Sequence, residues 1–532
     1  MSKEGKDAIV RSSAGMSVAT LLSRLLGLVR VRLEAAVLGG GIWASAWFLA
    51  FMLPNLFRRV LGEGAVGTAL MPLVAETESK EGNAAVRRKL TVVFTVLGGI
   101  LLLIVLICTG ASVWALHGIP AGSSGFFGKD YVRLALKLLP LLMPYAFFIC
   151  LAGVIGAVLN YARIFMLPAL AALLLNVVLL TGQIIVLCRN MPLTEALPLL
   201  AVMVPVAGVL HLGVLLWLLK RCGMFPEFSL EAFKDCRILG ELWHLALPGI
   251  LSFSALQVSF LADRFFAASL GAQAVPALTY VDRIVDLPVG VVAVSLGTVL
   301  MSGMSRAAAS GDHPEISRML IYGLRLIWFV CLPLAVMVIF FHEPMLRLLC
   351  LGGRYSESDL AAAKLVAIFY GMGIPLFCSL KVILPAFHAR KKMRTTLYVS
   401  LVAIGCNILL NLILMRYLRQ GGIALATTLA SLLNNSVLLI LLAREGLVRE
   451  YGALIKSLLR SLVISATVGG GLYWLYAKNL RSWAQRNFIN EFSALALTGM
   501  AMLLLFGVIS WLCGSREIKE LLPVLGRFKS RK

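Results

Sequence analysis

The chain has 532 residues, of which 60% are hydrophobic and only 14% are charged, and its mean hydropathy is +0.91. Soluble globular proteins are nearer half apolar and a quarter charged, so this composition excludes a soluble enzyme, a nucleic-acid-binding domain and a disordered chain. The formal net charge of +23 does not indicate nucleic acid, because the basic residues lie between long apolar runs. Lys and Arg collect in the cytoplasmic loops of membrane proteins. The composition therefore indicates a polytopic membrane protein.

Segments long enough to cross a bilayer recur along the whole chain. A membrane-spanning helix needs about 20 mainly apolar residues. The sequence contains about 14 such segments, over residues 13–38, 42–76, 89–116, 131–159, 164–187, 196–219, 243–270, 277–305, 319–341, 358–387, 395–415, 420–443, 458–477 and 492–514. The second segment is too long for one straight helix, and Pro54, Gly62 and Gly64 are expected to break it. The basic N-terminus precedes no short apolar core with a small-residue cleavage site, so no cleavable signal peptide is expected.

The charge of the loops predicts the orientation of these helices. If both termini are cytoplasmic, the tails and loops on the cytoplasmic side hold far more Lys and Arg than the loops on the opposite side. The clusters at 87–89 and 390–392 then lie in the cytoplasm. This asymmetry agrees with the positive-inside rule, and termini on one side require an even number of helices.

The chain also repeats itself at a nearly constant spacing. Three matches carry the repeat: Arg32-Leu33…Leu38-Gly39 with Arg264-Phe265…Leu270-Gly271, Arg163…Asn176 with Arg394…Asn407, and Gly67-Thr68-Ala69-Leu70-Met71 with Gly297-Thr298-Val299-Leu300-Met301. We predict two pseudo-symmetric six-helix lobes, 1–222 and 223–450, related by an axis along the membrane normal. Two extra helices and a basic tail occupy 451–532. Paired bundles around a central site are typical of alternating-access transporters.

Charged residues inside the apolar segments are mostly basic. The bases are Arg24, Arg30, Arg32, Arg58, Arg59, Lys137, Arg264, Arg283, Arg325, Lys364 and Lys381, whereas the acids are Glu34, Glu63, Asp263, Asp282 and Asp286. Each buried charge costs roughly 2.5–3.5 kcal/mol, and such charges normally face a water-filled cavity or a partner. The excess of base predicts a cavity that attracts anions. Arginine suits a phosphate because its planar guanidinium group donates two parallel hydrogen bonds.

Structural roles stay open for several of these residues. The side chains of Arg32 and Arg325 could extend to the membrane interface or form structural ion pairs. For Lys364 and Lys381, extension to the interface and a role inside the protein are equally open. Arg59 fits a structural role as well as a binding role. Arg30 and Glu34 lie four residues apart and could pair. Asp282 and Asp286 could neutralise Arg283 and its neighbours, and His211, alone in the sixth segment, is expected to be a satisfied core histidine.

The sequence contains no catalytic constellation. It has no HExxH, no grouping of Ser, His and Asp and no Walker loop, so we expect that the protein is not an enzyme and that transport does not use ATP. A glycan polymerase or ligase would need a catalytic acid or base in a sizeable exterior loop, and those loops are mostly short. A cation-exporting multidrug antiporter would need an acidic surplus in its cavity, which is the reverse of the pattern here.

Several stretches match the helix signatures of one transporter family. They are Ser23-Arg24-Leu25-Leu26-Gly27-Leu28-Val29-Arg30, then Phe51-Met52-Leu53-Pro54-Asn55-Leu56-Phe57-Arg58-Arg59 with Gly62-Glu63-Gly64-Ala65, then Tyr280-Val281-Asp282-Arg283 with Leu287-Pro288 and Gly297-Thr298, and Leu380-Lys381-Val382 with Pro385-Ala386-Phe387. Over nearly its whole length the chain resembles the MurJ/MviN lipid II flippases of the MOP exporter superfamily. The last two helices match in topology only.

The resemblance implies a function and a location. Such proteins move lipid II, the undecaprenyl-diphosphate-linked peptidoglycan precursor, from the inner to the outer leaflet of the bacterial inner membrane. It implies a multi-pass protein of that membrane with both termini cytoplasmic. The implied partners are lipid II or a related polyprenyl-diphosphate glycolipid, membrane lipids and other cell-wall synthesis proteins, but no nucleic acid.

The resemblance also implies a set of site residues. Arg24, Arg30, Arg58 and Arg283 would line a central cavity and bind the diphosphate and sugar headgroup, with Glu63 and Asp282 of the same motifs beside them. The last two helices would form a groove for the polyprenyl tail. No cofactor is expected except a sodium ion, whose site would match Asp263, Asn407, Asn411 and Thr427.

Three departures from the family pattern leave the cargo and the coupling ion open. Val31 stands where the family commonly has Asp, although Glu34 lies one turn further on. Ser45 replaces an Asp near the start of the second helix, and Asn411 replaces an acid of the cation site. The alternative prediction is a flippase for another undecaprenyl-diphosphate-linked oligosaccharide.

Overall fold

The protein is all-helical throughout the part of the chain that the computed structural model describes, namely residues 23–62, 65–120, 125–162, 164, 166–227, 237–448 and 451–518. Within these ranges the only β-type pairing is an isolated bridge between Gly352 and Tyr355. Ten of the described helices are long and apolar enough to cross a membrane. The predicted fold class is confirmed: the chain is an all-α polytopic membrane protein.

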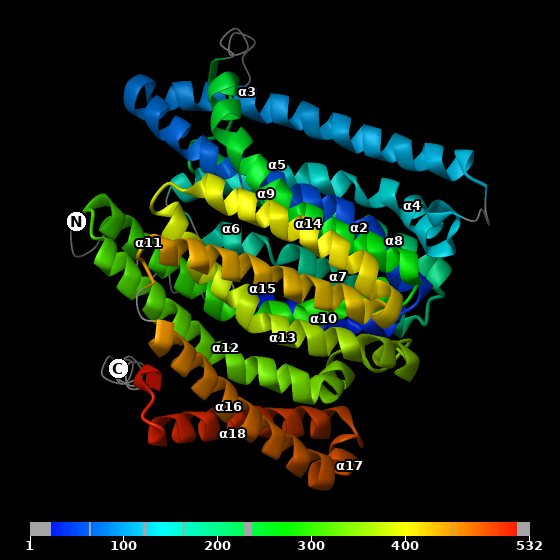
Figure 1. Cartoon of the computed structure of the whole chain (residues 1–532). Helices are drawn as coiled ribbons and strands as arrows, with labels where there is room; N and C mark the ends of the chain where they lie inside the picture. Colours follow the sequence, from blue (N-terminus) through cyan, green and yellow to red (C-terminus); the bar gives the residue numbers. More distant parts are fainter. Residues whose placement is uncertain are drawn as a thin grey trace. The chain divides into compact units, whose positions relative to one another are not determined.

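The helices follow one another with short connections (Figure 1). A first helix covers residues 23–38. It is followed by α2 (Ile42–Phe57), η1 (Arg58–Gly62), α3 (Ala65–Gly118), η2 (Phe126–Gly128), α4 (Asp130–Leu142), α5 (Pro144–Tyr161), α6 (Met166–Ala171), α7 (Leu174–Cys188), α8 (Leu193–Arg221), α9 (Arg237–Leu270), α10 (Ala274–Pro288), η4 (Val289–Ala293), α11 (Val294–Ala309), α12 (His313–Cys350), α13 (Glu357–His388), α14 (Met393–Leu418), α15 (Gln420–Arg444), α16 (Tyr451–Leu475), η5 (Tyr476–Leu480), α17 (Arg481–Ala484) and α18 (Phe488–Leu512).

The chain forms two compact units. Unit 1 comprises Met1–Arg264, Gly271–Pro276 and Gly352–Tyr355, and unit 2 comprises Phe265–Leu270, Ala277–Leu351 and Ser356–Lys532. Two short segments of the second half of the sequence thus pack with unit 1. The lobe boundaries that the repeat predicts, at residues 222 and 450, stay a prediction.

The break expected in the second apolar segment is not at Pro54. Pro54 lies inside α2, and the π-turn η1 begins directly after the end of α2 at Phe57. In unit 2, α10 ends at Pro288 and is likewise followed by a π-turn, η4. Proline removes a backbone donor from the helix ladder, and π-turns often mark functional positions in helices. The π-turn of unit 1 begins with Arg58.

In unit 2 the last helices pack on α12 through a hydrophobic core. Phe341 of α12 and Met502 and Phe506 of α18 belong to it, and the rings of Phe329 and Phe506 lie 4.8 Å apart. Just beyond α18, Glu517 receives hydrogen bonds from Arg325 of α12 at 2.8 Å and from Arg460 of α16 at 2.5 Å. Aromatic packing and a charged contact therefore both hold the C-terminal helices to α12.

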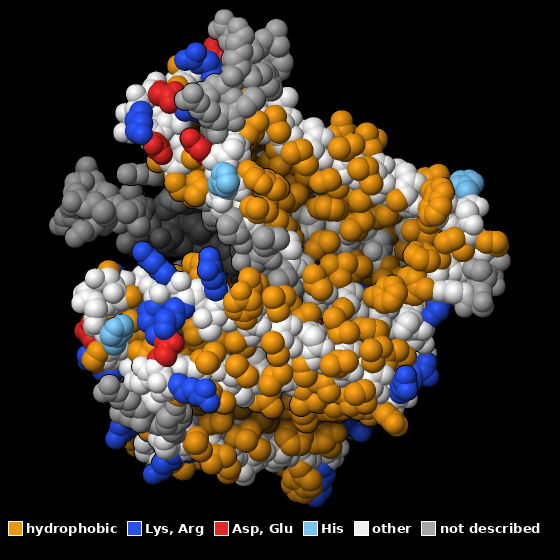
Figure 2. Space-filling model, turned by 45° about the horizontal axis from the view of Figure 1, so that its top comes forward, with side chains coloured by type: hydrophobic (Ala, Val, Ile, Leu, Met, Phe, Trp, Pro, Cys, Tyr) orange, Lys and Arg blue, Asp and Glu red, His pale blue; other side chains and the backbone are white. Residues whose placement is uncertain are grey.

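Much of the outer surface is apolar. Figure 2 shows one face on which hydrophobic side chains form a broad surface, with Lys and Arg gathered toward its edges. Exposed examples are Val402 and Leu409 on α14 and Leu504 and Leu512 on α18. A soluble monomer rarely exposes so extensive an apolar surface, whereas lipid tails cover it in a membrane protein.

Candidate functional site

Unit 1 contains a partly open cavity of about 360 Å³. It lies among η1, α3, α5, α6, α7 and α8, and most of its wall is apolar or made of small residues. The lining residues are Arg58, Gly62, Gly67, Met71, Tyr145, Ile149, Ala152, Gly153, Gly156, Ala157, Asn160, Pro168, Ala172, Leu175, His211 and Leu215. An apolar cavity with a few convergent polar groups is the usual form of a small-molecule or headgroup site.

Three of these side chains give the cavity its polarity. Arg58 contributes a guanidinium group, Asn160 an amide and His211 an imidazole. The Nε of Arg58 donates a 3.2 Å hydrogen bond to Oδ1 of Asn55, one helical turn earlier, and this contact orients the guanidinium group. None of the described lining residues carries a carboxylate, and the guanidinium group of Arg58 favours an anionic or neutral polar group over a cation.

Close packing of η1 against α5 forms one edge of the cavity. A Cβ atom at Gly153 would lie 2.0 Å from the carbonyl oxygen of Gly62, so no larger residue fits there. At Gly156, one turn further along α5, a Cβ atom would meet nothing within 4 Å. The free volume of the cavity therefore begins directly beside the close contact between η1 and α5.

His211 differs from the expectation of a satisfied core histidine. Its ring lines the cavity and is half-buried. Among the described residues it has no hydrogen-bond partner. In the sequence His211 is an isolated polar residue in an apolar helix, and no sequence pattern singles out Asn160. Only the packing of α5 against α8 brings both residues to Arg58.

The two neighbouring arginines of η1 have different surroundings. Arg58 lines the cavity, whereas Arg59 contacts α9. The Nη1 of Arg59 donates to Oε1 of Gln257 at 3.4 Å, and its guanidinium carbon lies 5.1 Å from the ring centre of Phe260. The guanidinium carbon of Arg264 lies 4.8 Å from the centre of the same ring. These cation–π contacts support a structural role for Arg59 and Arg264.

The predicted binding residues of the first helix lie in unit 1. Arg24 is half-buried and Arg30 is 8% exposed. Glu34, one turn after Arg30, is 5% exposed and accepts a 2.6 Å hydrogen bond from the indole of Trp47 on α2. Val31 is buried, and the hydroxyl of Ser45 donates to the carbonyl oxygen of Ala272 at 2.5 Å. At these two positions the structure therefore places a packed apolar group and a hydrogen bond to a turn residue.

The remaining predicted binding residues are in unit 2 or outside the described residues. Asp282 and Arg283 are both half-buried on α10. Arg283 makes no hydrogen bond or ion pair with any residue that the structure describes. Glu63 lies outside the described residues. Arg24, Arg30 and Arg58 thus belong to unit 1, where only Arg58 lines the cavity, and Asp282 and Arg283 belong to unit 2.

Three of the four predicted sodium ligands form a hydrogen-bonded cluster in unit 2. The Nδ2 of Asn411 donates to Oδ1 of Asn407 at 3.2 Å, and the Nδ2 of Asn407 donates to Oγ1 of Thr427 at 3.4 Å. Asp263 is 5% exposed and belongs to unit 1. The predicted sodium site stays a prediction.

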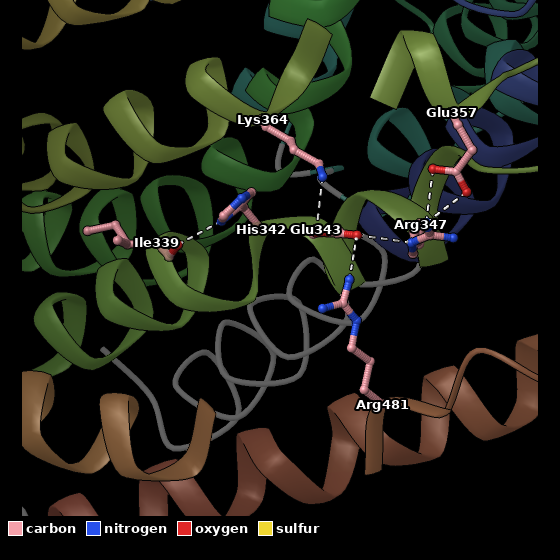
Figure 3. Close-up of polar contacts among 7 residues, drawn as sticks. All are labelled: Ile339, His342, Glu343, Arg347, Glu357, Lys364 and Arg481. Carbon is pink, nitrogen blue, oxygen red and sulfur yellow. Dashed lines mark hydrogen bonds and ion pairs between the residues drawn. The ribbon is translucent and has the colours of Figure 1, made fainter. Parts of the chain in front are cut away.

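Two of the embedded bases of unit 2 are neutralised within the protein. Arg325 pairs with Glu517, and Lys364 lies 3.1 Å from Glu343. Figure 3 shows Glu343 surrounded by Lys364, Arg347 and Arg481, while Arg347 also contacts Glu357. Their acidic partners lie outside the apolar segments or at their ends, so these acids are not among the charged residues inside the segments. No group of three or more His, Cys, Asp or Glu side chains that could hold a metal occurs in the described part of the chain.

The fold is that of MOP-type transporters. A solved lipid II flippase MurJ in an inward closed conformation superposes with a TM-score of 0.74 at 23% identity, covering 93% of this chain and 98% of that one. An inward-facing multidrug transporter of the MATE family superposes with a TM-score of 0.63 at 15% identity, covering 84% and 99%. At these identities the comparison concerns the fold alone.

Sequence comparison places the chain in one family of this fold. The family described as "Lipid II flippase MurJ" matches residues 34–492, so the chain belongs to it. The lipid II flippase MurJ of Burkholderia cenocepacia is 28% identical over 468 residues, which cover 88% of this chain and 90% of that protein. A probable lipid II flippase MurJ of Rhizobium tropici is 30% identical over 477 residues, which cover 88% and 87%. The family is one of transporters rather than of catalysts.

Proposed function

We propose that this protein translocates lipid II from the inner to the outer leaflet of the bacterial inner membrane by alternating access. Membership of the family supports lipid II as the cargo, and the surroundings of Arg283 support the binding of an anionic diphosphate group. A half-buried guanidinium group such as that of Arg283 on α10, without a hydrogen bond or ion pair to the described residues, is costly unless a ligand neutralises it. A diphosphate supplies the matching charge and geometry.

The transport step follows from the same chemistry. The anionic headgroup enters a cavity that faces the cytoplasm while the polyprenyl tail stays in lipid. Contacts of Arg24, Arg30, Arg58 and Arg283 with the headgroup replace its hydration, and a change of conformation then exposes it on the other side. The protein changes no covalent bond of the cargo, so we propose transport without catalysis.

The orientation and the coupling ion belong to the same proposal. Both termini are cytoplasmic, in agreement with the loop charges. Sodium coupling would need the carboxylate of Asp263 in addition to Asn407, Asn411 and Thr427. Membrane lipids and other cell-wall synthesis proteins are the proposed further partners.

Rescue of a strain depleted of its own lipid II flippase tests the function. The wild-type gene is expected to restore growth, and the purified protein is expected to move labelled lipid II across proteoliposomes. If the protein instead moves only another undecaprenyl-diphosphate-linked oligosaccharide, lipid II is not its cargo. Replacing sodium by potassium in the same vesicles tests the coupling ion.

A further inference from the structure

Two uncharged polar side chains in the cavity of unit 1 have no partner among the described residues. The amide of Asn160, at the end of α5, and the imidazole of His211, on α8, both line the cavity and are half-buried. Neither side chain makes a hydrogen bond to any residue that the structure describes. A polar group that leaves water without gaining a partner costs free energy. These two groups therefore require a polar occupant of the cavity.

The chemistry of the pair favours an uncharged occupant with several polar groups. The carboxamide of Asn160 carries two donors and an acceptor, and a neutral imidazole carries one of each. Both side chains therefore pair with hydroxyl groups and amides, which also donate and accept. A sugar presents such groups around the edge of its ring.

The walls of the cavity match the faces of a sugar ring. Ile149, Leu175 and Leu215 contribute aliphatic surface, and Gly156 and Ala172 leave space beside them. The C–H groups on the faces of a sugar are apolar, so they pack against such walls while the groups at the edge reach polar side chains. The volume of about 360 Å³ is within the range for small organic ligands and far exceeds that of a single water site.

Arg58 lines the same cavity and adds a contact for a phosphate. Its guanidinium group is oriented by the 3.2 Å hydrogen bond to Asn55 and suits a phosphate oxygen. In a lipid-linked glycan the diphosphate is bonded directly to the first sugar. One cation beside two uncharged polar groups therefore matches the order of groups in such a lipid.

We propose that the cavity of unit 1 binds the sugar next to the diphosphate, and that Asn160 and His211 determine the preference for a glycosylated lipid. The proposal rests on the flippase function proposed above, and it adds a sugar pocket within unit 1 to the arginines that bind the diphosphate. In the predicted topology Asn160 follows the fourth apolar segment, on the cytoplasmic side. The sugar is thus recognised on the side where the headgroup enters.

Binding of two lipids to the purified protein in detergent tests the proposal. The probes are undecaprenyl diphosphate and the same lipid carrying one N-acetylated hexose. The wild-type protein is expected to bind the glycosylated lipid about tenfold more tightly or better. Asn160→Leu and His211→Leu are each expected to reduce this ratio about fivefold, because each removes hydrogen bonds to the sugar. His211→Gln is expected to retain part of the preference, since a glutamine amide also donates and accepts.

Three control variants separate sugar recognition from general effects. Gln183→Leu is the matched control, because Gln183 on α7 is a buried amide of unit 1 that does not line the cavity, and the ratio is expected to stay unchanged. Arg58→Ala is expected to weaken both lipids, since both carry the diphosphate. Arg416→Ala is expected to weaken neither, since Arg416 is exposed and has no polar partner among the described residues.

Filling the cavity gives an independent measurement if a leucine variant at position 160 or 211 does not fold. Gly156→Leu removes no polar group but occupies the space of the ring, and it is expected to abolish the preference for the glycosylated lipid. Gly213→Leu, at an equally open position outside the lining, is expected to retain it.

An unchanged ratio in Asn160→Leu, His211→Leu and Gly156→Leu would show that the cavity holds water only, and this result overturns the proposal. Equal weakening of both lipids by these variants overturns it as well. If the wild-type protein moves lipid II in vesicles and the ratio does not respond, the sugar pocket is wrong and the proposed function stands. If it moves no lipid II but the ratio falls as expected, the proposed function fails and the sugar pocket stands.

Discussion

The indole Nε1 of Trp47 donates a 2.6 Å hydrogen bond to the buried carboxylate of Glu34. This contact joins α2 to the first helix in the part of the chain that carries Arg24 and Arg30. The sequence suggested instead that Glu34 pairs with Arg30 or replaces the acid missing at Val31. The structure assigns Glu34 a hydrogen bond that holds two helices together.

Removal of the indole donor is expected to destabilise the protein. Trp47→Phe keeps an aromatic ring beside Phe51, whose ring lies 5.8 Å away, but leaves Glu34 without this hydrogen bond. A buried acceptor that loses its donor costs about 1–3 kcal/mol of unfolding free energy. Thermal unfolding in detergent measures the loss. The double variant Trp47→Phe/Glu34→Met is expected to recover most of it, and an unchanged unfolding temperature for Trp47→Phe would contradict this role.

Charge removal at the proposed binding arginines is expected to abolish transport but not folding. Arg30→Ala and Arg283→Ala each remove a group that donates charge-assisted hydrogen bonds, and a loss of roughly a hundredfold in flipping rate is expected. Rescue of a flippase-depleted strain and lipid II flipping in vesicles are the measurements, with Arg416→Ala as control. If Arg30→Ala and Arg283→Ala both rescue the strain, the assignment of these residues to the headgroup is wrong.

Filling the cavity of unit 1 is expected to slow transport without loss of stability. Gly156→Leu projects into free volume, since a Cβ atom at this position meets nothing within 4 Å. In a helix leucine is favoured over glycine by up to about 1 kcal/mol, so the fold should not weaken. Gly213→Leu is the matched control, because Gly213 on α8 is exposed and equally open. Equal flipping rates for the two variants would show that the cavity is not used by the headgroup.

The ion pairs of Glu517 are expected to make stability depend on pH. Burial alone would raise the pKa of Glu517, but hydrogen bonds from Ser515, Ser457, its own backbone and Arg325 outweigh burial and lower the pKa to about 2. A lowered pKa stabilises the folded state above the ordinary carboxyl pKa, and this contribution is lost as the pH falls toward 2.

Glu517→Gln is therefore expected to reduce the free energy of unfolding by about 2 kcal/mol or more, because Arg325 and Arg460 also lose their counter-charge. The difference from wild type should be constant between about pH 5 and 7 and shrink below about pH 4.5. Unfolding in detergent at several pH values measures it. A difference that grows as the pH falls would contradict the lowered pKa.

Much of the fold could be read from the sequence because a bilayer imposes simple rules. Helix length and the absence of long polar stretches predict the spanning segments, and Pro54 with Gly62 predicts a break near η1. The motif predicts a binding role for Arg58. Its surroundings could not be predicted, because Asn160 and His211 come from helices far away in the sequence.

The sequence by itself determined that this protein is a helical membrane transporter with an excess of embedded arginine, since composition and hydrophobic pattern depend only on local residue order. Only the tertiary structure decided which charges are neutralised and which line a cavity. Arg325 meets Glu517 and Arg354 meets Ala36 across long stretches of chain. Such pairs depend on how helices pack, and packing responds to side-chain shape and glycine contacts that no local pattern records.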